Sequence, residues 1–194
     1  MLQPKKPVLI LASSSPRRQE LLREAGIPFE VHPAHLNEEQ NPGEPPMEYA
    51  RRLSREKAQA VSASHPKQFV LGADTIVVVG DEVLGKPRDV ADAERMLRLL
   101  SGREHEVTTA VSLIMPAGKT ETRSTTTTVC FRNLNEDEIR QYVAGGEPMD
   151  KAGAYAIQGG ASRWTNRIEG EYSNVVGLPL SLVTEMLRAS GFLQ

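Results

Sequence analysis

Short apolar runs alternate with helically spaced apolar positions along the first half of the chain. Continuous apolar runs at 8–12 and 69–74 have the length of buried strands, and the alternating segment 29–32 predicts another strand. Apolar positions with helical spacing fill 16–25 and 47–64 between these runs. This succession of strands and helices predicts an α/β fold.

Residues that begin and end helices flank these patterns. Ser15, Asp89 and Asn135 each stand directly before a helical pattern, where a side-chain oxygen can cap the first turn. Gly26 and Gly102 stand where helices are expected to end. The remaining helical patterns occupy 90–102, 135–146 and 178–191.

The middle of the chain has the periodicity of paired strands. The segment 75–85 is predicted to form a hairpin that turns at Gly80-Asp81, and two long strands at 105–115 and 119–131 flank the turn "PAG". The other segments are an irregular Gly/Ala-rich stretch at 147–161 and a strand and turn within 163–176. With no repeat or linker in view, we expect residues 1–194 to form one domain with a mixed central β-sheet flanked by helices.

The composition narrows the class of protein. Apolar residues make up 39% and charged residues 25% of the chain, as in ordinary globular proteins. The formal net charge of −2 gives no positive field that would attract nucleic acid or an anionic membrane, and we expect neither as a partner. A single cysteine, Cys130, excludes an internal disulfide, and no apolar run is long enough for a membrane span or a secretion signal. We therefore expect a cytoplasmic protein.

The stretch "SSSPRR" at residues 13–18 combines hydroxyl groups with two fixed cations at the start of a helix. The first turn of a helix has unpaired N–H groups that attract anions, and Ser13, Arg17 and Arg18 add further donors suited to phosphate. Cations at this end oppose the helix dipole by about 0.3–1 kcal/mol each, which a bound anion would offset. The alternative is a solvated turn with two surface arginines.

Carboxylates and lysines form a second set of candidates. Asp74 ends an apolar run, so we expect it at the carboxyl edge of the sheet, where it can hold a divalent cation or position water. The alternative for Asp74 is a local cap or turn. Taken alone, Lys57, Lys86 and the acidic pair Glu38-Glu39 read as solvated surface charges.

The segment "GEPMDKAGAYAIQG" is a further candidate for ligand binding. Its small residues allow the backbone to approach a ligand closely, and the amide of Gln158 can both donate to and accept from a polar ring edge. The alternative is a Gly-rich loop that packs under a helix. Several cations together with a metal held by carboxylates suit attack on a phosphate chain.

The order of these motifs resembles the Maf family of nucleoside triphosphate pyrophosphatases. The motifs are "SSSPRR", "EEQ", "RLSREKA", "GADT", "GKP", "LSGREHEVTTAV", "GEPMDKAGAYAIQG" and "GEYSNVVGLP", and they extend from about Leu9 to Leu187. The segment "DKAGAYAIQG" is most similar to the subgroup that acts on dTTP and UTP. The resemblance implies hydrolysis of these nucleotides, or of modified pyrimidine triphosphates, to the monophosphate and pyrophosphate.

The resemblance also implies roles for individual residues. Asp74 corresponds to the proton acceptor that activates water, and Asp74 and Glu38 to the residues near a divalent metal, Mg²⁺ first and Mn²⁺ or Co²⁺ as alternatives. The loop is about one residue longer than the family pattern, which leaves Glu39 as an alternative to Glu38, and Trp164 stands where a smaller residue is usual. The positions around the triphosphate are Ser13, Arg17, Arg18, Lys57 and Lys86, and those linked to base preference are Arg17, Thr75 and Gln158.

The implied fold is the two-lobed, inosine triphosphatase-like (Maf/Ham1-like) architecture with a central cleft. Family members are commonly homodimeric and have been linked to cell division and septum control. A nucleotide sensor without catalysis is one competing hypothesis, which release of pyrophosphate from dTTP would exclude. A nucleic-acid-binding module is another, and the aromatic content of 5% and the lack of a basic stripe speak against it.

Overall fold

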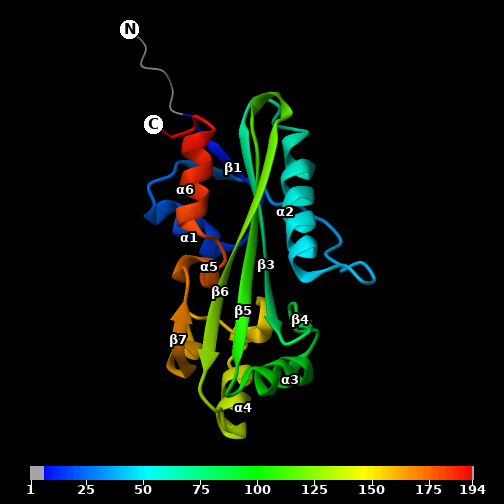
Figure 1. Cartoon of the computed structure of the whole chain (residues 1–194), viewed down its shortest axis with the longest axis vertical. Helices are drawn as coiled ribbons and strands as arrows, with labels where there is room; N and C mark the ends of the chain where they lie inside the picture. Colours follow the sequence, from blue (N-terminus) through cyan, green and yellow to red (C-terminus); the bar gives the residue numbers. More distant parts are fainter. Residues whose placement is uncertain (1–6, 194) are drawn as a thin grey trace. The chain divides into compact units, whose positions relative to one another are not determined.

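The computed structural model describes residues 7–193, and it has the mixed α/β architecture that the sequence predicts (Figure 1). Within this range the strands pair in the order β2-β1-β3-β5-β6-β7, and β4 pairs with β3. The strands are β1 (Leu9–Leu11), β2 (Phe29–Val31), β3 (Phe69–Val79), β4 (Glu82–Leu84), β5 (Glu104–Ile114), β6 (Thr120–Phe131) and β7 (Thr165–Glu169).

Helices connect and cover the strands. The α-helices are α1 (Pro16–Glu24), α2 (Pro46–Ser62), α3 (Val90–Leu100), α4 (Glu136–Ala144), α5 (Tyr172–Val176) and α6 (Leu180–Ala189). Four short 3₁₀ turns complete the described chain: η1 (Pro116–Gly118), η2 (Glu147–Asp150), η3 (Ala152–Ala154) and η4 (Gly160–Trp164). Three of these turns lie in or next to the Gly/Ala-rich segment for which the sequence shows no regular pattern.

The predicted N-caps of α1, α3 and α4 are confirmed. The side chain of Ser15 accepts from the N–H of Arg18, and that of Asp89 accepts from the N–H of Asp92. At α4, Asn135 Oδ1 accepts from the N–H of Glu138 at 2.9 Å. The Glu138 carboxylate accepts in return from the N–H of Asn135 at 3.2 Å, which completes a capping box.

The chain divides into two compact units. Unit 1 contains the residues up to Asp74, the segment Ala110–Ser124 and the residues from Gly177 onward. Unit 2 contains Thr75–Thr109 and Thr125–Val176. Strands β3, β5 and β6 contribute residues to both units, whereas a cleft between two lobes stays a prediction.

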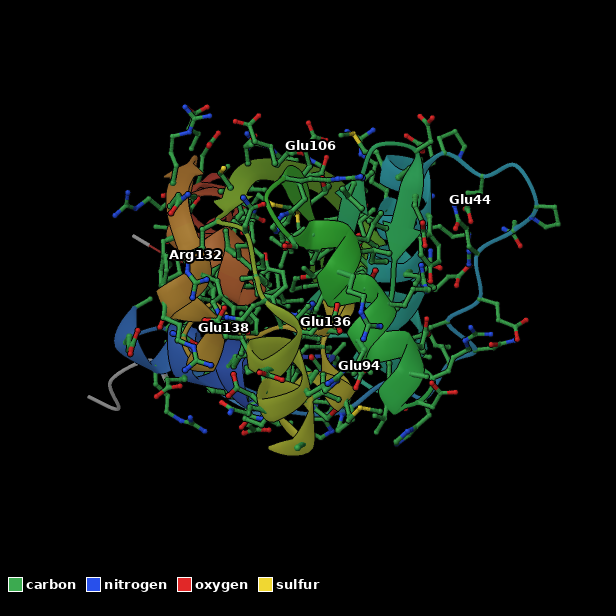
Figure 2. The ribbon with its side chains drawn as sticks, turned by 90° about the horizontal axis from the view of Figure 1, so that it is seen from below. Glu44, Glu94, Glu106, Arg132, Glu136 and Glu138 are labelled. Carbon is green, nitrogen blue, oxygen red and sulfur yellow. The ribbon has the colours of Figure 1, made fainter. Side chains whose placement is uncertain are left out.

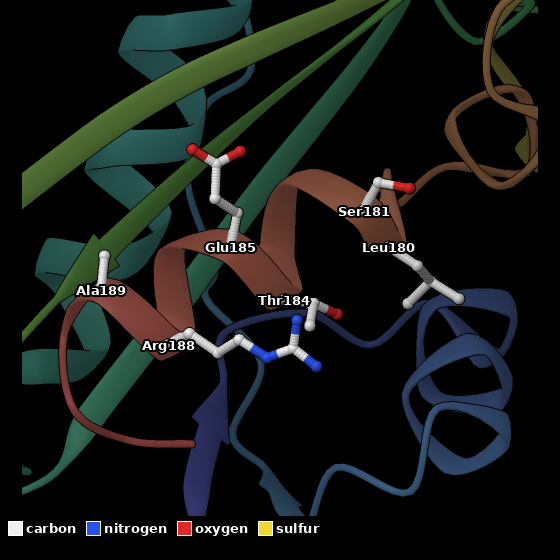
Figure 3. Close-up of a pocket in the computed structure, with 6 residues that line it drawn as sticks. All are labelled: Leu180, Ser181, Thr184, Glu185, Arg188 and Ala189. Carbon is white, nitrogen blue, oxygen red and sulfur yellow. The ribbon is translucent and has the colours of Figure 1, made fainter. Parts of the chain in front are cut away.

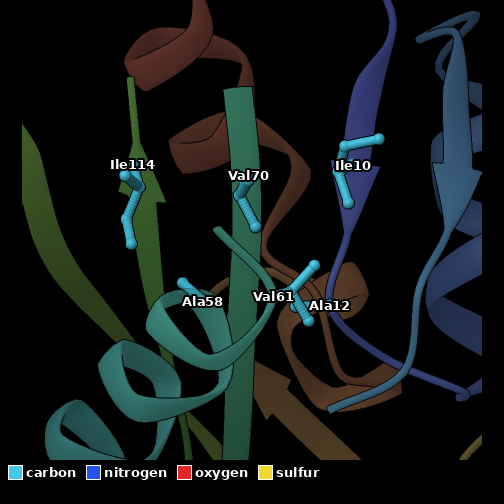
Figure 4. Packing of buried hydrophobic residues seen from close by; sticks show 6 residues of the cluster. All are labelled: Ile10, Ala12, Ala58, Val61, Val70 and Ile114. Atoms are coloured by element: carbon cyan, nitrogen blue, oxygen red, sulfur yellow. The ribbon is translucent and has the colours of Figure 1, made fainter. Parts of the chain in front are cut away.

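Unit 1 is built on parallel strands, because β1 pairs in parallel with both β2 and β3. Ile10 of β1 and Val70 of β3 pack against Ala58 and Val61 of α2 (Figure 4). These four side chains are buried, so α2 covers this face of the strands. In Figure 1, α2 and α6 lie on opposite sides of the unit 1 strands.

The other face of the unit 1 strands is also covered. Leu9 and Leu11 alternate with Ile10 along β1, so their side chains point to the face opposite α2, and both are fully buried. Phe69 of β3 pairs with Leu9, so its side chain points to the same face. Its ring lies 5.3 Å from that of Phe192, which follows α6. Burial on both faces explains the continuous apolar runs of these strands.

Unit 2 has an aromatic core. Its members are edge-to-face neighbours with ring centroids 4.7 to 6.1 Å apart: His105, Phe131, Tyr142, Tyr155 and Trp164. Trp164 is fully buried there. His105 Nε2 and the Tyr155 hydroxyl lie 2.9 Å apart, and burial lowers the pKa of His105 to about 4. The core therefore holds a neutral histidine at neutral pH.

The structure corrects the prediction for residues 69–85. The apolar run 69–74 and the first arm of the hairpin are one strand, β3, so Asp74 lies within the strand and not at its end. The burial of Ile76 and Val77 explains the difference, because the apolar pattern resumes after two polar positions, Asp74 and Thr75. The hairpin is confirmed: Val78 pairs with Val83, and Gly80 has a positive φ of 57° in the turn.

A second correction concerns the segment 163–176. The predicted strand is β7, but the predicted turn is the short helix α5. Asn174 fixes this helix, since its Nδ2 donates to the carbonyl of Val107 and to the hydroxyl of Thr127, both at 2.9 Å. A buried amide with partners on two strands favours an ordered helix over an open turn.

Charged side chains surround these cores. Figure 2 labels Glu44 on the loop before α2, and Glu136 and Glu138 at the start of α4 near Arg132. The Arg132 guanidinium lowers the pKa of Glu138 to about 2. Among residues 7–193, no helix is long and apolar enough to cross a membrane.

Candidate active site

A buried ion pair forms a charged centre in unit 1. Lys57 of α2 donates from Nζ to Asp74 Oδ1 of β3 at 2.6 Å, and both side chains are buried. The same Nζ lies 2.8 Å from Glu38 Oε1. One ammonium group therefore bridges two carboxylates.

Gly72 explains how α2 comes close enough to make this pair. A Cβ at Gly72 would lie 2.3 Å from the carbonyl oxygen of Ser54 and 2.7 Å from the backbone nitrogen of Ala58. These two residues flank Lys57 on α2, and Gly72 shares a face of β3 with Asp74 because side chains alternate along a strand. The missing side chain at Gly72 thus lets Lys57 reach Asp74.

Arg18 joins this centre from the first turn of α1. Its guanidinium donates to the carbonyls of Ala73 at 2.9 Å and Gly177 at 2.8 Å, and to the Ser13 hydroxyl at 3.2 Å. Burial lowers the pKa of Arg18, and the nearby charges of Asp74 and Glu38 oppose that change. Arg18 therefore ties α1 to β3 besides bringing positive charge to the centre.

Burial also shapes the acid–base chemistry of Asp74. Desolvation raises the pKa of Asp74, and the charges of Lys57 and Arg18 offset part of that rise. A carboxylate with a raised pKa binds a proton more readily than an exposed one. Asp74 is therefore a candidate for a proton acceptor in unit 1.

A clamp on α2 holds the loop that carries Glu38. Arg52 donates from Nε and Nη2 to the two carboxylate oxygens of Glu44 at 2.7 and 2.8 Å, and to the carbonyl of Glu39 at 2.9 Å. The Tyr49 hydroxyl donates to the carbonyl of Glu38 at 2.6 Å. The Arg52 guanidinium lowers the pKa of Glu44 to about 2, so this pair stays charged at neutral pH.

The two carboxylates beside Lys57 are suitable ligands for a divalent cation. Mg²⁺ binds carboxylate oxygens and usually completes its shell with substrate phosphates and waters. Asp74 and Glu38 both lie within hydrogen-bond distance of one point, the Lys57 ammonium. Their donor chemistry therefore fits Mg²⁺ bound together with a triphosphate.

Thr75 begins unit 2 and is linked to two residues that the sequence reading missed. Its hydroxyl lies 2.9 Å from the Thr109 hydroxyl, which donates to the carbonyl of Asn174 at 3.2 Å. Because Thr109 has one hydroxyl proton, Thr75 donates to Thr109.

Lys86 and Gln158 lie on neighbouring segments of unit 2. Lys86 is exposed on the turn after β4, and the N–H of Gly153 donates to the carbonyl of Gly85 at 3.1 Å. This bond joins the lysine turn to η3, which leads toward Gln158. Gln158 is exposed, whereas residues 153–157 before it are buried.

Comparison with known proteins identifies the family. The family model described as "Maf-like protein" matches residues 8–190. The chain belongs to the Maf family. The dTTP/UTP pyrophosphatase of Koribacter versatilis (strain Ellin345) is 56% identical over 95% of each chain, and that of Geobacter sp. (strain M21) is 51% identical over 97% of this chain and 98% of its own. Among solved structures, the Staphylococcus aureus Ham1 protein matches 93% of this chain and 98% of its own with a TM-score of 0.47 and 14% identity.

Five of the positions implied by the Maf resemblance come together in unit 1. They are Ser13, Arg18, Glu38, Lys57 and Asp74. Of the two loop glutamates, Glu38 places its carboxylate at Lys57, while Glu39 contacts Arg52 through its backbone carbonyl. Arg17 is half-buried on the first turn of α1, and Thr75, Lys86 and Gln158 belong to unit 2.

The sequence did not indicate three residues that hold the loops of the candidate site, namely Tyr49, Arg52 and Tyr142. Arg52 and Tyr49 lie one and two helical turns before Lys57 on α2. Arginine and tyrosine are common on helices, so their presence there gives no signal of a role at the site. Tyr142 reads as an ordinary core aromatic. Their roles depend on loops that fold back onto α2 and α4, which no local pattern indicates.

A shallow hollow along α6 is separate from this chemistry (Figure 3). It is lined by Leu180, Ser181, Thr184, Glu185, Arg188 and Ala189. Glu185 accepts from Arg123 Nη1 of β6 at 2.8 Å. The hollow follows a single helix, and none of the predicted site residues lines it.

Proposed function

We propose that this chain hydrolyses dTTP and UTP between the α and β phosphorus atoms and releases the nucleoside monophosphate and pyrophosphate. Membership of the Maf family and the names of relatives at 56% and 51% identity support this proposal. The observation that carries it is the charged centre in which the Lys57 ammonium bridges Asp74 and Glu38.

Asp74 is the proposed proton acceptor. A water molecule gives a proton to the Asp74 carboxylate and attacks the α phosphorus, and the bond from the α phosphorus to the α–β bridging oxygen breaks, so that pyrophosphate leaves with that oxygen. Burial favours this role because it raises the pKa of Asp74, and general base catalysis contributes about 10²–10⁴-fold to a rate. Lys57 fixes the orientation of Asp74 through the 2.6 Å hydrogen bond.

Positive charge around the centre suits a triphosphate. The first turn of α1 carries the Arg18 guanidinium, which donates to the Ser13 hydroxyl just before the helix, and a cation and a hydroxyl at the start of a helix suit phosphate. Direct phosphate contacts of Arg17 and Lys86 are proposed on the family pattern alone. A divalent cation held by Asp74 and Glu38, which we propose to be Mg²⁺, would neutralise phosphate oxygens when bound.

The base preference is proposed to come from Gln158 together with Thr75 and Arg17. An amide presents one donor and one acceptor, which matches the Watson–Crick edge of uracil and thymine. A site built on such bonds rejects a ligand that leaves its polar groups unpaired. A homodimeric state, a cytoplasmic location and a link to cell division stay predictions of the resemblance.

A nucleotide panel tests the proposal directly. Pyrophosphate release from dTTP, UTP, CTP, GTP and 7-methyl-GTP is measured with Mg²⁺, Mn²⁺ or Co²⁺ and with a chelator. We expect dTTP and UTP to be the best substrates, CTP a weaker one, and the purine nucleotides poor ones. Preference for GTP or 7-methyl-GTP would contradict the substrate assignment, and binding of dTTP without pyrophosphate release would favour a nucleotide sensor.

A further inference from the structure

Gln158 lies on a tight turn whose geometry is well defined. The N–H of Gly159 donates to the carbonyl of Ala156 at 3.0 Å, so Ile157 and Gln158 occupy the two central positions. Ile157 is buried at 5% exposure, and Gln158 is exposed. The turn thus anchors one side chain in unit 2 and presents the next one, the amide, outward.

Two side chains outside the turn fix its ends. The Tyr142 hydroxyl of α4 accepts from the N–H of Ala156 at 2.9 Å and donates to Glu147 Oε1 at 3.0 Å. The Glu147 carboxylate of η2 accepts from the N–H of Gly160, at 3.2 and 3.3 Å from its two oxygens. Tyr142 and Glu147 are bonded to each other and hold backbone groups two residues before and two residues after Gln158.

Two glycines after Gln158 allow Glu147 and Tyr142 to approach the backbone of the turn. A Cβ at Gly159 would lie 1.9 Å from Glu147 Oε1, and a Cβ at Gly160 would lie 3.0 Å from the ring of Tyr142. Any other residue at Gly159 would displace the carboxylate. The glycine pair after Gln158 is therefore explained by the approach of Glu147 and Tyr142 to the backbone.

We propose that Tyr142 and Glu147 are positioning residues that set the base preference of this enzyme by fixing the turn that carries Gln158. The inference rests on the proposed function, in which the Gln158 amide reads the pyrimidine edge. An amide discriminates between bases only if its donor and acceptor stay aligned with the ring, because hydrogen bonds weaken steeply with angle. The paired bonds on both sides of Gln158 supply that alignment.

Tyr142→Phe is the sharpest test. Phenylalanine keeps the ring that packs at 4.7 Å on Trp164 and removes both hydroxyl bonds. We expect the ratio of kcat/KM for dTTP to that for CTP or GTP to fall about 3- to 10-fold, the effect of losing one or two hydrogen bonds. Glu147→Ala should lower the ratio similarly, and Glu147→Gln, which keeps an acceptor for Gly160, should lower it less.

Asn135→Ala is the matched control. It removes the capping box of α4, the helix that carries Tyr142, and leaves the bonds of Tyr142 and Glu147 in place. It should lower the melting temperature by an amount comparable to Tyr142→Phe and leave the nucleotide ratio unchanged. If Tyr142→Phe lowers kcat/KM by the same factor for every nucleotide, or lowers only the melting temperature, the inference is overturned.

A double-mutant cycle separates this inference from the proposed function. In a Gln158→Ala background, Tyr142→Phe should no longer change the nucleotide ratio, and an undiminished change would overturn the positioning role. A wild type that ranks the nucleotides differently would contradict the proposed substrates. In that case, Tyr142→Phe would still support the inference if it made the kcat/KM values of the nucleotides more alike and speeded hydrogen exchange at residues 157–160. If neither the kcat/KM ratios nor the exchange rates changed, the inference would be overturned.

Discussion

The charged centre of unit 1 and the aromatic core of unit 2 bury their polar side chains in different chemical states. Unit 1 buries Lys57, Asp74 and Arg18, and each of them bonds a charged group or a backbone carbonyl. Unit 2 buries His105 and Tyr155 as a hydrogen-bonded pair among aromatic rings, where desolvation lowers the pKa of the histidine. Charges remain where opposite charges surround them, and a lone titratable group becomes neutral.

The two units also anchor their loops differently. In unit 1, the Arg52 guanidinium holds the loop of Glu38 through charged bonds to Glu44 near the surface. In unit 2, the Tyr142 hydroxyl holds the turn of Gln158 from within the core. On the proposed function, the first arrangement suits a loop that brings a metal-binding carboxylate to the substrate, and the second suits a turn that must keep one orientation.

Removing the charge of Asp74 should have the largest effect. Asp74→Asn keeps the shape of the side chain and loses the proton acceptor, so turnover of dTTP should fall by about 10²–10⁴-fold. Asp92→Asn is the control, because Asp92 is a buried carboxylate of unit 2 that pairs with Arg88 and Arg95. It should lower stability and leave turnover near that of the wild type. Near wild-type turnover for Asp74→Asn would exclude Asp74 from the chemistry.

Acid should destabilise the protein through His105. Above pH 6.5 this histidine is neutral in the folded and unfolded states; between pH 6.5 and about 4 only the unfolded chain gains its proton. The free energy of unfolding should therefore fall with pH in this window, by about 3 kcal/mol in total. Urea titrations at pH 7.5, 5.5 and 4.5 measure the loss. His105→Gln should flatten this dependence, and identical pH profiles for the wild type and His105→Gln would contradict the assignment.

Releasing the loop of Glu38 should have an intermediate effect. Arg52→Ala removes the bidentate bonds to Glu44, and we expect turnover to fall about tenfold for every nucleotide alike. Arg52→Lys should restore little, because an ammonium cannot bond both oxygens with the same geometry. Arg98→Ala, which removes a surface network on α3, serves as the control and should leave turnover unchanged. If Arg52→Ala lowered turnover more for one nucleobase than for another, it would contradict the expectation that the loop of Glu38 takes no part in base preference.

Tyr155→Phe should have the smallest effect. It removes the partner of His105 Nε2 within the aromatic core, at a cost of about 1 kcal/mol in the free energy of unfolding. Turnover and nucleotide ranking should not change, in contrast to Tyr142→Phe. Thermal unfolding and the nucleotide panel measure both quantities, and an altered ranking would show that the core acts on base choice without the Tyr142 hydroxyl.

Much of the fold could be read from local patterns. The strands at 8–12, 29–32 and 119–131 and the caps at Ser15 and Asn135 were predicted because apolar periodicity and capping act over a few residues. Asp74 was predicted to end its strand, and the structure places it within β3. A polar residue inside an apolar run is ambiguous locally, since the side chain that pairs with it lies on another element.

The sequence by itself determined the family and the charged residues of the candidate site, including Asp74 as the candidate proton acceptor. Eight motifs in a fixed order are specific even without coordinates. Only the tertiary structure decided that Lys57 bridges Asp74 and Glu38, that Gly72 admits α2, and that His105 is neutral. It also showed Arg52, Tyr142 and Glu147 as anchors of the two loops. These facts depend on contacts between residues distant in the chain and on the water that folding removes around them, and neither is encoded in the spacing of neighbouring residues.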